Sequence, residues 1–143
     1  MKLIGQNFLL LSYKIFRVMD DLLIPAQEDS PEINFNAKDG VLRITGRAYS
    51  NDMVNLFKKL NIWLDEYLAN PSQQTTLMLQ IDYSNSVCSR LVYDFIVKCK
   101  NVLNQGKQLN IKWYHYGGDE DGIDYANLVS KLINYPIENI EID

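Results

Sequence analysis

The spacing of the apolar residues changes repeatedly between residues 30 and 140, and this alternation constrains the fold more than any other feature. Segments 30–36 and 41–46 alternate apolar and polar side chains, as half-buried strands do, and Lys38-Asp39-Gly40 between them is typical of a tight turn. From Met53 to Leu68, apolar residues recur every three or four positions, which indicates an amphipathic helix. These segments predict a β-hairpin followed by a helix.

The same two patterns continue along the rest of the chain. Strands are predicted at 75–83 and 109–114, helices at about 87–103 and 123–133, and a short last strand at 136–140. Gly106 is the residue type expected just after the end of a helix. A hairpin followed by alternating helices and strands predicts a single α/β domain whose mixed sheet contains parallel βαβ units. We expect the helices to lie mainly on one face of this sheet.

The length of 143 residues fits one domain, which we place at residues 25–143. Residues 1–24 are interpreted as an N-terminal extension, either loosely docked or, up to residue 18, the product of a start codon upstream of Met19. The apolar run in residues 1–11 is too short to span a bilayer and lacks the small residues of a signal-peptide cleavage site. We therefore expect a cytoplasmic protein without membrane insertion.

Charge and cysteine usage exclude several other classes. The net charge is −4 and no cluster of lysine or arginine interrupts it, which argues against nucleic acid as a partner. Cys88 and Cys99 fall in one predicted helix, where their positions would be about 16 Å apart, too far for a disulfide. Both are predicted to be small buried residues of a reduced compartment.

Residues with catalytic or metal-binding potential are few. His115 is the one histidine, and neither a nucleophile-elbow motif nor a phosphate-binding loop accompanies it. Two cysteines and one histidine do not make a zinc site, and the acidic run 119–121 lacks the spacing of a calcium loop. We expect that run to favour a helix N-terminus instead. No cofactor and no catalysis are predicted, although a small hydrolase using Ser86 or Cys88 with His115 stays open as an alternative.

The junction between the strand at 75–83 and the next helix is the most informative stretch. Ser84, Asn85 and Ser86 are three successive candidates for the helix N-cap. A phosphate on Ser86 would meet unpaired backbone N–H groups and the positive end of the helix dipole, and Arg90, one turn further, could pair with it. The residues alone leave two interpretations open, a simple helix cap and a phosphorylation site.

Seven short motifs, in order and spread over about four fifths of the chain, resemble a known family. They are S-P-E-I-N-F-N at 30–36, G-V-L-R-I-T-G at 40–46, A-Y-S-N-D at 48–52, W-L-D-E-Y-L at 63–68, Y-S-N-S-V-C-S-R at 83–90, Q-G-K at 105–107 and W-Y at 113–114. This series is similar to that of the SiaC family of regulatory phosphoproteins, which are STAS-like bacterial signalling domains. The resemblance implies a STAS-like fold.

The resemblance also implies a phosphorylation switch rather than an enzyme. In the family, a threonine is modified by a partner protein kinase and cleared by a PP2C-type phosphatase. The unmodified protein activates a diguanylate cyclase, which raises cyclic di-GMP and promotes aggregation or biofilm growth. Carried over by position, the acceptor is Ser86 in place of the threonine, with Asn85 and Arg90 next to the phosphate. Val87 and Cys88 replace two serines of the family pattern.

The partner surface is expected near the same end of the sheet. Tyr49, Tyr83 and Trp113 are the predicted contact residues, because exposed aromatic side chains often anchor interfaces. Burial in the core is an equally good interpretation of Trp113. An anti-sigma-factor antagonist of the same fold is the nearest alternative function, and a structural assembly module is a further one.

Overall fold

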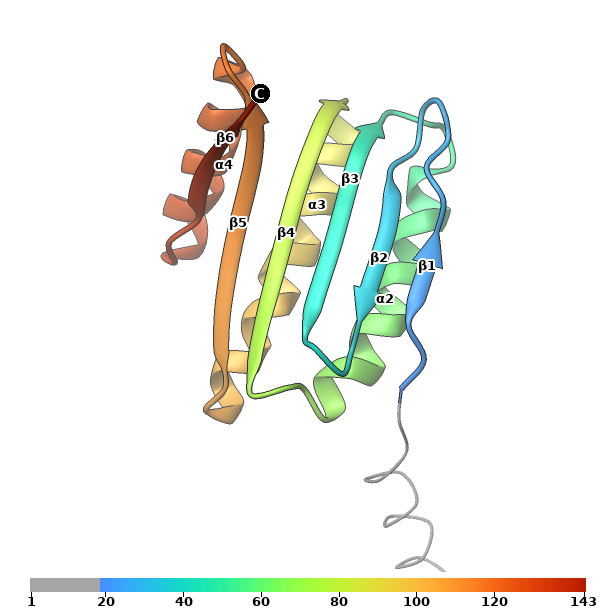
Figure 1. The fold of residues 1–143 in the computed structure, drawn as a ribbon, viewed down its shortest axis with the longest axis vertical. Helices are drawn as coiled ribbons and strands as arrows, with labels where there is room; N and C mark the ends of the chain where they lie inside the picture. The colour runs from blue at the N-terminus through green and yellow to red at the C-terminus, as the bar shows by residue number, and fades with distance from the viewer. Residues whose placement is uncertain (1–18) are drawn as a thin grey trace, which may run out of the picture.

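The computed structural model describes residues 19–143, apart from the side chain of Tyr83. The expectations for residues 1–18 lie outside this range. The described residues form one mixed sheet with strands in chain order, β1 to β6 (Figure 1). The strands are β1 (Leu22–Ile24), β2 (Glu32–Asn36), β3 (Val41–Ala48), β4 (Gln74–Ser84), β5 (Gln108–Tyr116) and β6 (Glu138–Ile142). The helices are α2 (Met53–Ala69), α3 (Ser86–Cys99), α4 (Glu120–Ile133) and the short 3₁₀-helix η1 (Lys100–Gln105).

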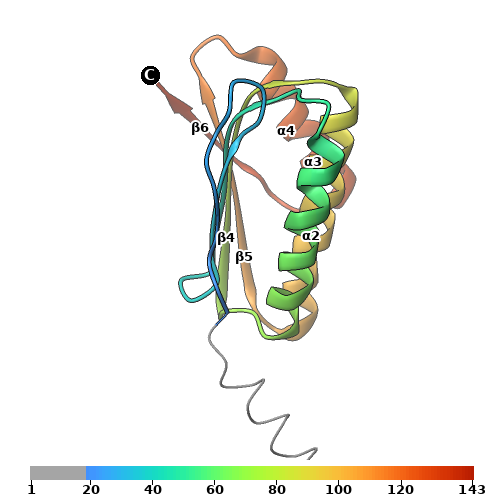
Figure 2. The same cartoon turned by 90° about the vertical axis from the view of Figure 1, so that its right-hand side faces the viewer.

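The direction of the strands follows their connections. β1, β2 and β3 are antiparallel neighbours, whereas β3, β4, β5 and β6 run parallel to one another. Each parallel pair is joined through one of the three described α-helices, and all three lie on the same face of the sheet (Figure 2). The predicted α/β class, with a hairpin, parallel βαβ units and helices on one face, is confirmed.

The core lies between the sheet and this helix layer. Alternate residues of β2, such as Ile33 and Phe35, are almost fully buried, as are Phe57 of α2 and Phe95 of α3. The Phe35 ring stacks on Phe95 with ring centroids 5.7 Å apart. Burying each such side chain contributes roughly 1.5–3 kcal/mol before entropy is counted. The period-2 pattern therefore marks the strand residues that face the core, and the period-3.6 pattern marks the helix residues that face it from the other side.

The domain begins earlier than the expected boundary at residue 25. Leu22–Ile24, which we assigned to the extension, form the edge strand β1 and pair with Ile33–Phe35 of β2. The indole Nε1 of Trp63 donates a hydrogen bond to the backbone oxygen of Asp20 at 2.9 Å, and Met19 packs against the core. Three residues are too few to show an alternating pattern, so this strand depends on tertiary contacts.

Two helices differ in detail from the predictions. The helix expected at 87–103 ends at Cys99 and continues as η1, and Gly106 follows in the left-handed conformation with φ of 73°, as predicted for a helix end. α4 begins at Glu120, before the expected start at 123, and its apolar residues Leu128 and Leu132 are 55% and 61% exposed. The buried stripe of α4 is instead formed by Ala126, Val129 and Ile133.

Both cysteines are buried and reduced, as predicted. Desolvation by burial raises the pKa of each thiol, so neither is poised to react as a thiolate. Within residues 19–143, the helices lack the length and apolar character that crossing a bilayer requires.

Candidate regulatory site at the carboxyl end of the sheet

The predicted site residues gather at one edge of the sheet. β3, β4 and β5 all end at this edge, which is the upper edge in Figure 1, and α2, α3 and α4 begin there. In open α/β sheets, the carboxyl ends of the parallel strands are where ligands and partners usually bind. The chain connectivity therefore brings the loop after β3, the β4–α3 junction and the loop after β5 to a common surface.

Asn85 is the N-cap of α3. Its backbone is extended, with φ of −102° and ψ of 178°, and its Oδ1 accepts a hydrogen bond from the backbone N–H of Cys88 at 2.9 Å. The two other predicted cap candidates are thus not used in this role. Ser86 is the first helical residue and is exposed. No hydrogen bond joins its hydroxyl to another described side chain, so the hydroxyl is accessible for modification.

The first turn of α3 also suits a negative group electrostatically. It contains no acidic residue, and the backbone N–H groups of Ser86 and Val87 lie where a helix provides no acceptor of its own. The helix dipole places partial positive charge at the same point. A phosphate on Ser86 would therefore find donors and a favourable field close to its point of attachment.

Arg90 is engaged with another residue in the unmodified protein. Its Nε donates to the two carboxylate oxygens of Asp94, at 3.1 and 3.3 Å. Asp94 lies one turn towards the C-terminus of α3, away from Ser86. The two side chains are 76% and 54% exposed, and exposed pairs of this kind contribute about 0–1 kcal/mol.

The three predicted contact residues differ in accessibility. Tyr49 is 40% exposed in the loop between β3 and α2, and its backbone N–H donates to the oxygen of Asp29 at 3.0 Å. Trp113 is only 3% exposed and packs against Tyr125 with ring centroids 5.3 Å apart, which matches the core interpretation rather than an exposed contact. The side chain of Tyr83 lies outside the described part of the chain, and its backbone belongs to β4.

A cleft of about 720 Å³, which the sequence did not predict, opens beside the start of α3. The pairing of β4 with β5 ends at Leu79 and Trp113, although both strands continue beyond these residues. Figure 1 shows the two strands diverging towards this edge. The charged residues lining the cleft are Arg47, Asp82, Asp119 and Asp121, and Ser84 and Ser89, on either side of Ser86 in the chain, line it as well.

The far wall of the cleft is fixed by α4. The hydroxyl of Tyr125 donates to the backbone oxygen of Ser89 at 2.6 Å, which ties α4 to the first turns of α3. Burial, with a smaller effect of the Asp94 carboxylate, raises the pKa of Tyr125, so this hydroxyl stays protonated. Asp119 caps α4 by accepting from the N–H of Gly122 at 3.0 Å, and Glu120 and Asp121 follow in the first turn, as predicted for this acidic run.

Of the groups considered for catalysis, Ser86 is exposed, whereas Cys88 and His115 are buried. His115 is 7% exposed, and its Nδ1 lies 3.2 Å from the backbone oxygen of Tyr116. The described residues include no group of three or more His, Cys, Asp or Glu side chains arranged to hold a metal ion.

Comparison with known proteins agrees with this architecture. An uncharacterized protein of Pseudomonas aeruginosa (strain UCBPP-PA14) is 24% identical over 118 residues, which is 82% of this chain and 94% of that protein. The crystal structure of apo-SiaC from Pseudomonas aeruginosa superposes with a TM-score of 0.75 at 22% identity and covers 85% of this chain and 99% of that one. A complex described as the diguanylate cyclase SiaD with its activator SiaC gives a TM-score of 0.78 at 21% identity, covering 85% and 100%.

The family comparison also covers most of the chain. The model for the SiaC family of regulatory phosphoproteins matches residues 24–142, which includes all of β2 to β6 and their connecting helices. This range contains the hairpin motifs, the β4–α3 junction and the end of β5 on which the resemblance was based. The chain therefore belongs to the SiaC family of regulatory phosphoproteins.

Proposed function

We propose that this protein is a non-enzymatic switch whose unmodified form binds and activates a diguanylate cyclase, and whose Ser86 is phosphorylated by a protein kinase and dephosphorylated by a PP2C-type phosphatase. The observation that carries the proposal is the accessibility of Ser86 at the first position of α3, where Asn85 already provides the cap. A phosphate can be added there without removing a hydrogen bond that the helix start needs.

The cyclase as effector is supported by a relative. SiaC from Pseudomonas aeruginosa is described as the activator of the diguanylate cyclase SiaD, with which it forms a complex. Production of cyclic di-GMP, and with it biofilm growth, is the output that this partner would control. Membership of a family of phosphoproteins supports a modified residue. Ser86 is the position implied by the resemblance of residues 83–90 to the family motif.

The expected effect of the phosphate is electrostatic. It would add about −1.5 to −2 charges at neutral pH, next to a cleft that already contains three aspartates. If an effector covers this edge, the added charge would have to be desolvated within the contact, which is costly unless a partner group neutralises it. Tyr49, in the exposed loop after β3, is a contact residue in this proposal, and the phosphorylated form releases the cyclase.

The test is a binding and activity assay with purified cyclase. We expect unmodified protein and Ser86→Ala to bind and activate the cyclase, and protein with phosphoserine incorporated at position 86 to do neither. Gln73→Glu is the matched control, because it adds a negative charge at an exposed position at the opposite edge of the sheet. Equal activation by all four proteins would refute the switch. Recovery of an anti-sigma kinase without any cyclase from native lysate would instead favour the anti-sigma-factor antagonist.

A further inference from the structure

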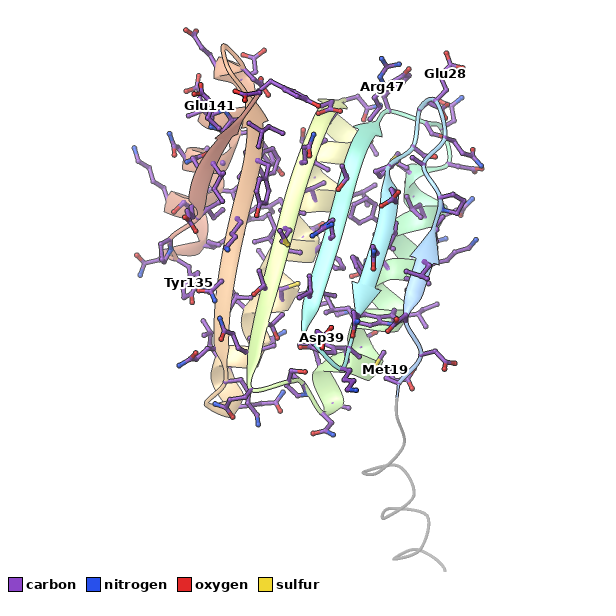
Figure 3. The ribbon with its side chains drawn as sticks, viewed as in Figure 1. Met19, Glu28, Asp39, Arg47, Tyr135 and Glu141 are labelled. Atoms are coloured by element: carbon purple, nitrogen blue, oxygen red, sulfur yellow. The ribbon has the colours of Figure 1, made fainter. Side chains whose placement is uncertain are left out.

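The arginine that the structure places beside the start of α3 is not the one in the family motif. Arg47 is near the end of β3, where its Cα pairs with that of Tyr83 in β4. Ser86 follows only three residues after Tyr83. Figure 3 shows Arg47 at the edge where β3 and β4 end and α3 begins.

An irregularity in the sheet produces this position. The register between β3 and β4 shifts between Gly46 and Arg47, because Gly46 pairs with Ile81 whereas Arg47 pairs with Tyr83. The extra residue of β4, Asp82, therefore has no partner in β3. Bulges of this kind bend a strand and often occur next to functional sites. Here the shift brings the β4–α3 junction one residue closer to the end of β3, and so closer to Arg47.

The side chain of Arg47 shares a surface with the residues that flank Ser86. Arg47, Ser84 and Ser89 all line the cleft between β4 and β5. Ser86 and Ser89 are three residues apart on α3, so they are neighbours on the helix surface. Among the described residues that line the cleft, Arg47 is the one basic residue, and Asp82, Asp119 and Asp121 are the acidic ones. A phosphate at the rim of this cleft is repelled by the carboxylates and attracted by the guanidinium.

Arg90 is less well placed for the same role. Its guanidinium is directed towards Asp94, one turn further along α3 and away from Ser86, through two contacts of Nε. We propose that Arg47, rather than Arg90, is the cation that binds the phosphate on Ser86 and thereby joins the end of β3 to the start of α3. This inference rests on the proposed phosphorylation of Ser86. It assigns a positioning role to a residue outside the β4–α3 motif.

The experiment is a ³¹P NMR titration of protein with phosphoserine incorporated at position 86. A guanidinium in contact with the phosphate lowers its second pKa, ordinarily about 6, whereas the carboxylates of Asp82, Asp94, Asp119 and Asp121 can only raise it. We expect Arg47→Gln to raise this pKa by about half to one unit. Arg47→Lys, which keeps the charge but loses the planar fork, should give a smaller rise.

Two matched variants complete the design. Arg43→Gln removes the same residue type from the same strand, about 13 Å away, and Arg90→Gln removes the motif arginine. Both should leave the phosphate pKa unchanged, and thermal unfolding of each variant verifies that it is folded. The proposal would be overturned if the phosphate pKa rose with Arg90→Gln but not with Arg47→Gln, or if it rose with neither. The titration requires neither kinase nor cyclase, so it can fail while the switch stands, and the switch can fail while Arg47 still binds the phosphate.

Discussion

The side chain of Asn85 accepts a hydrogen bond from the backbone N–H of Cys88 at 2.9 Å. Asn85 therefore has the structural role at the start of α3, whereas the candidate for chemical modification is Ser86. Because the cap is provided by Asn85, Ser86 is not required for the helix to begin. The thiol of Cys88 is buried against the core, so the same turn is anchored on its inner side. A modification of Ser86 can then change the surface without unfolding the helix.

This separation predicts different effects for two neighbouring substitutions. Asn85→Ala removes the cap and should lower the free energy of unfolding by about 1 kcal/mol. Ser86→Ala should change it by less than about 0.5 kcal/mol, since no described side chain bonds its hydroxyl. Urea unfolding followed by circular dichroism measures both. A larger loss for Ser86→Ala than for Asn85→Ala would show that the hydroxyl, not the amide, supports the helix.

The turn between β2 and β3 gives a second prediction. Gly40 has φ of +67°, and a Cβ added there would lie 2.3 Å from the backbone oxygen of Gln74. Gly40→Ala therefore combines backbone strain with a clash that no flexible side chain can relieve. We expect a loss of about 2 kcal/mol or more in the free energy of unfolding. Gly106→Ala is the matched control, because Gly106 is also left-handed but has open space around it, and its loss should be nearer 1 kcal/mol.

The N-terminal boundary is tested by truncation. A chain that starts at Met19 retains β1 and the hydrogen bond from Trp63 to Asp20. A chain that starts at Pro25 loses both, together with the packing of Leu22 and Ile24. We expect the second truncation to lose about 2–4 kcal/mol relative to the first. Equal stability of the two chains would show that β1 contributes nothing to the domain.

The sequence predicted the elements whose apolar pattern extends over several residues, because burial against the sheet imposes that pattern directly. α2 and β5, for example, lie within two residues of their expected ends. The short β1 was missed because its position depends on pairing with β2 and on Trp63. The cleft was missed because it depends on where the pairing of β4 with β5 stops, at Leu79, and nothing local in either strand marks that point.

The candidate site likewise combines residues that the sequence could suggest with residues that only the fold brings together. Asn85, Ser86 and Arg90 could be proposed from the sequence because they lie within one short motif, residues 83–90, at a strand–helix junction. Arg47 is almost forty residues earlier in the chain, and its place beside the junction comes from a register shift that only the folded sheet reveals. Trp113 was ambiguous because an aromatic residue near a strand end serves equally well as core or as contact, and the fold places it in the core.

The contact between Tyr125 and Ser89 leads to a prediction about alkaline pH. The Tyr125 hydroxyl donates to the Ser89 oxygen at 2.6 Å, so Tyr125→Phe should cost about 1 kcal/mol at neutral pH. Burial, followed by the Asp94 carboxylate, raises the pKa of Tyr125 in the folded protein above its unfolded value of about 10. Between the two pKa values the unfolded chain binds fewer protons than the folded one, so this contribution is complete below about pH 10 and is lost as the pH rises further. The loss from this group is at most about 1.4 kcal/mol per pH unit.

Urea unfolding at pH 8 to 11 should therefore show a shallower alkaline decline in the free energy of unfolding for Tyr125→Phe than for the wild type. An equally steep decline in Tyr125→Phe would mean that the buried hydroxyl does not link α4 to α3 as described.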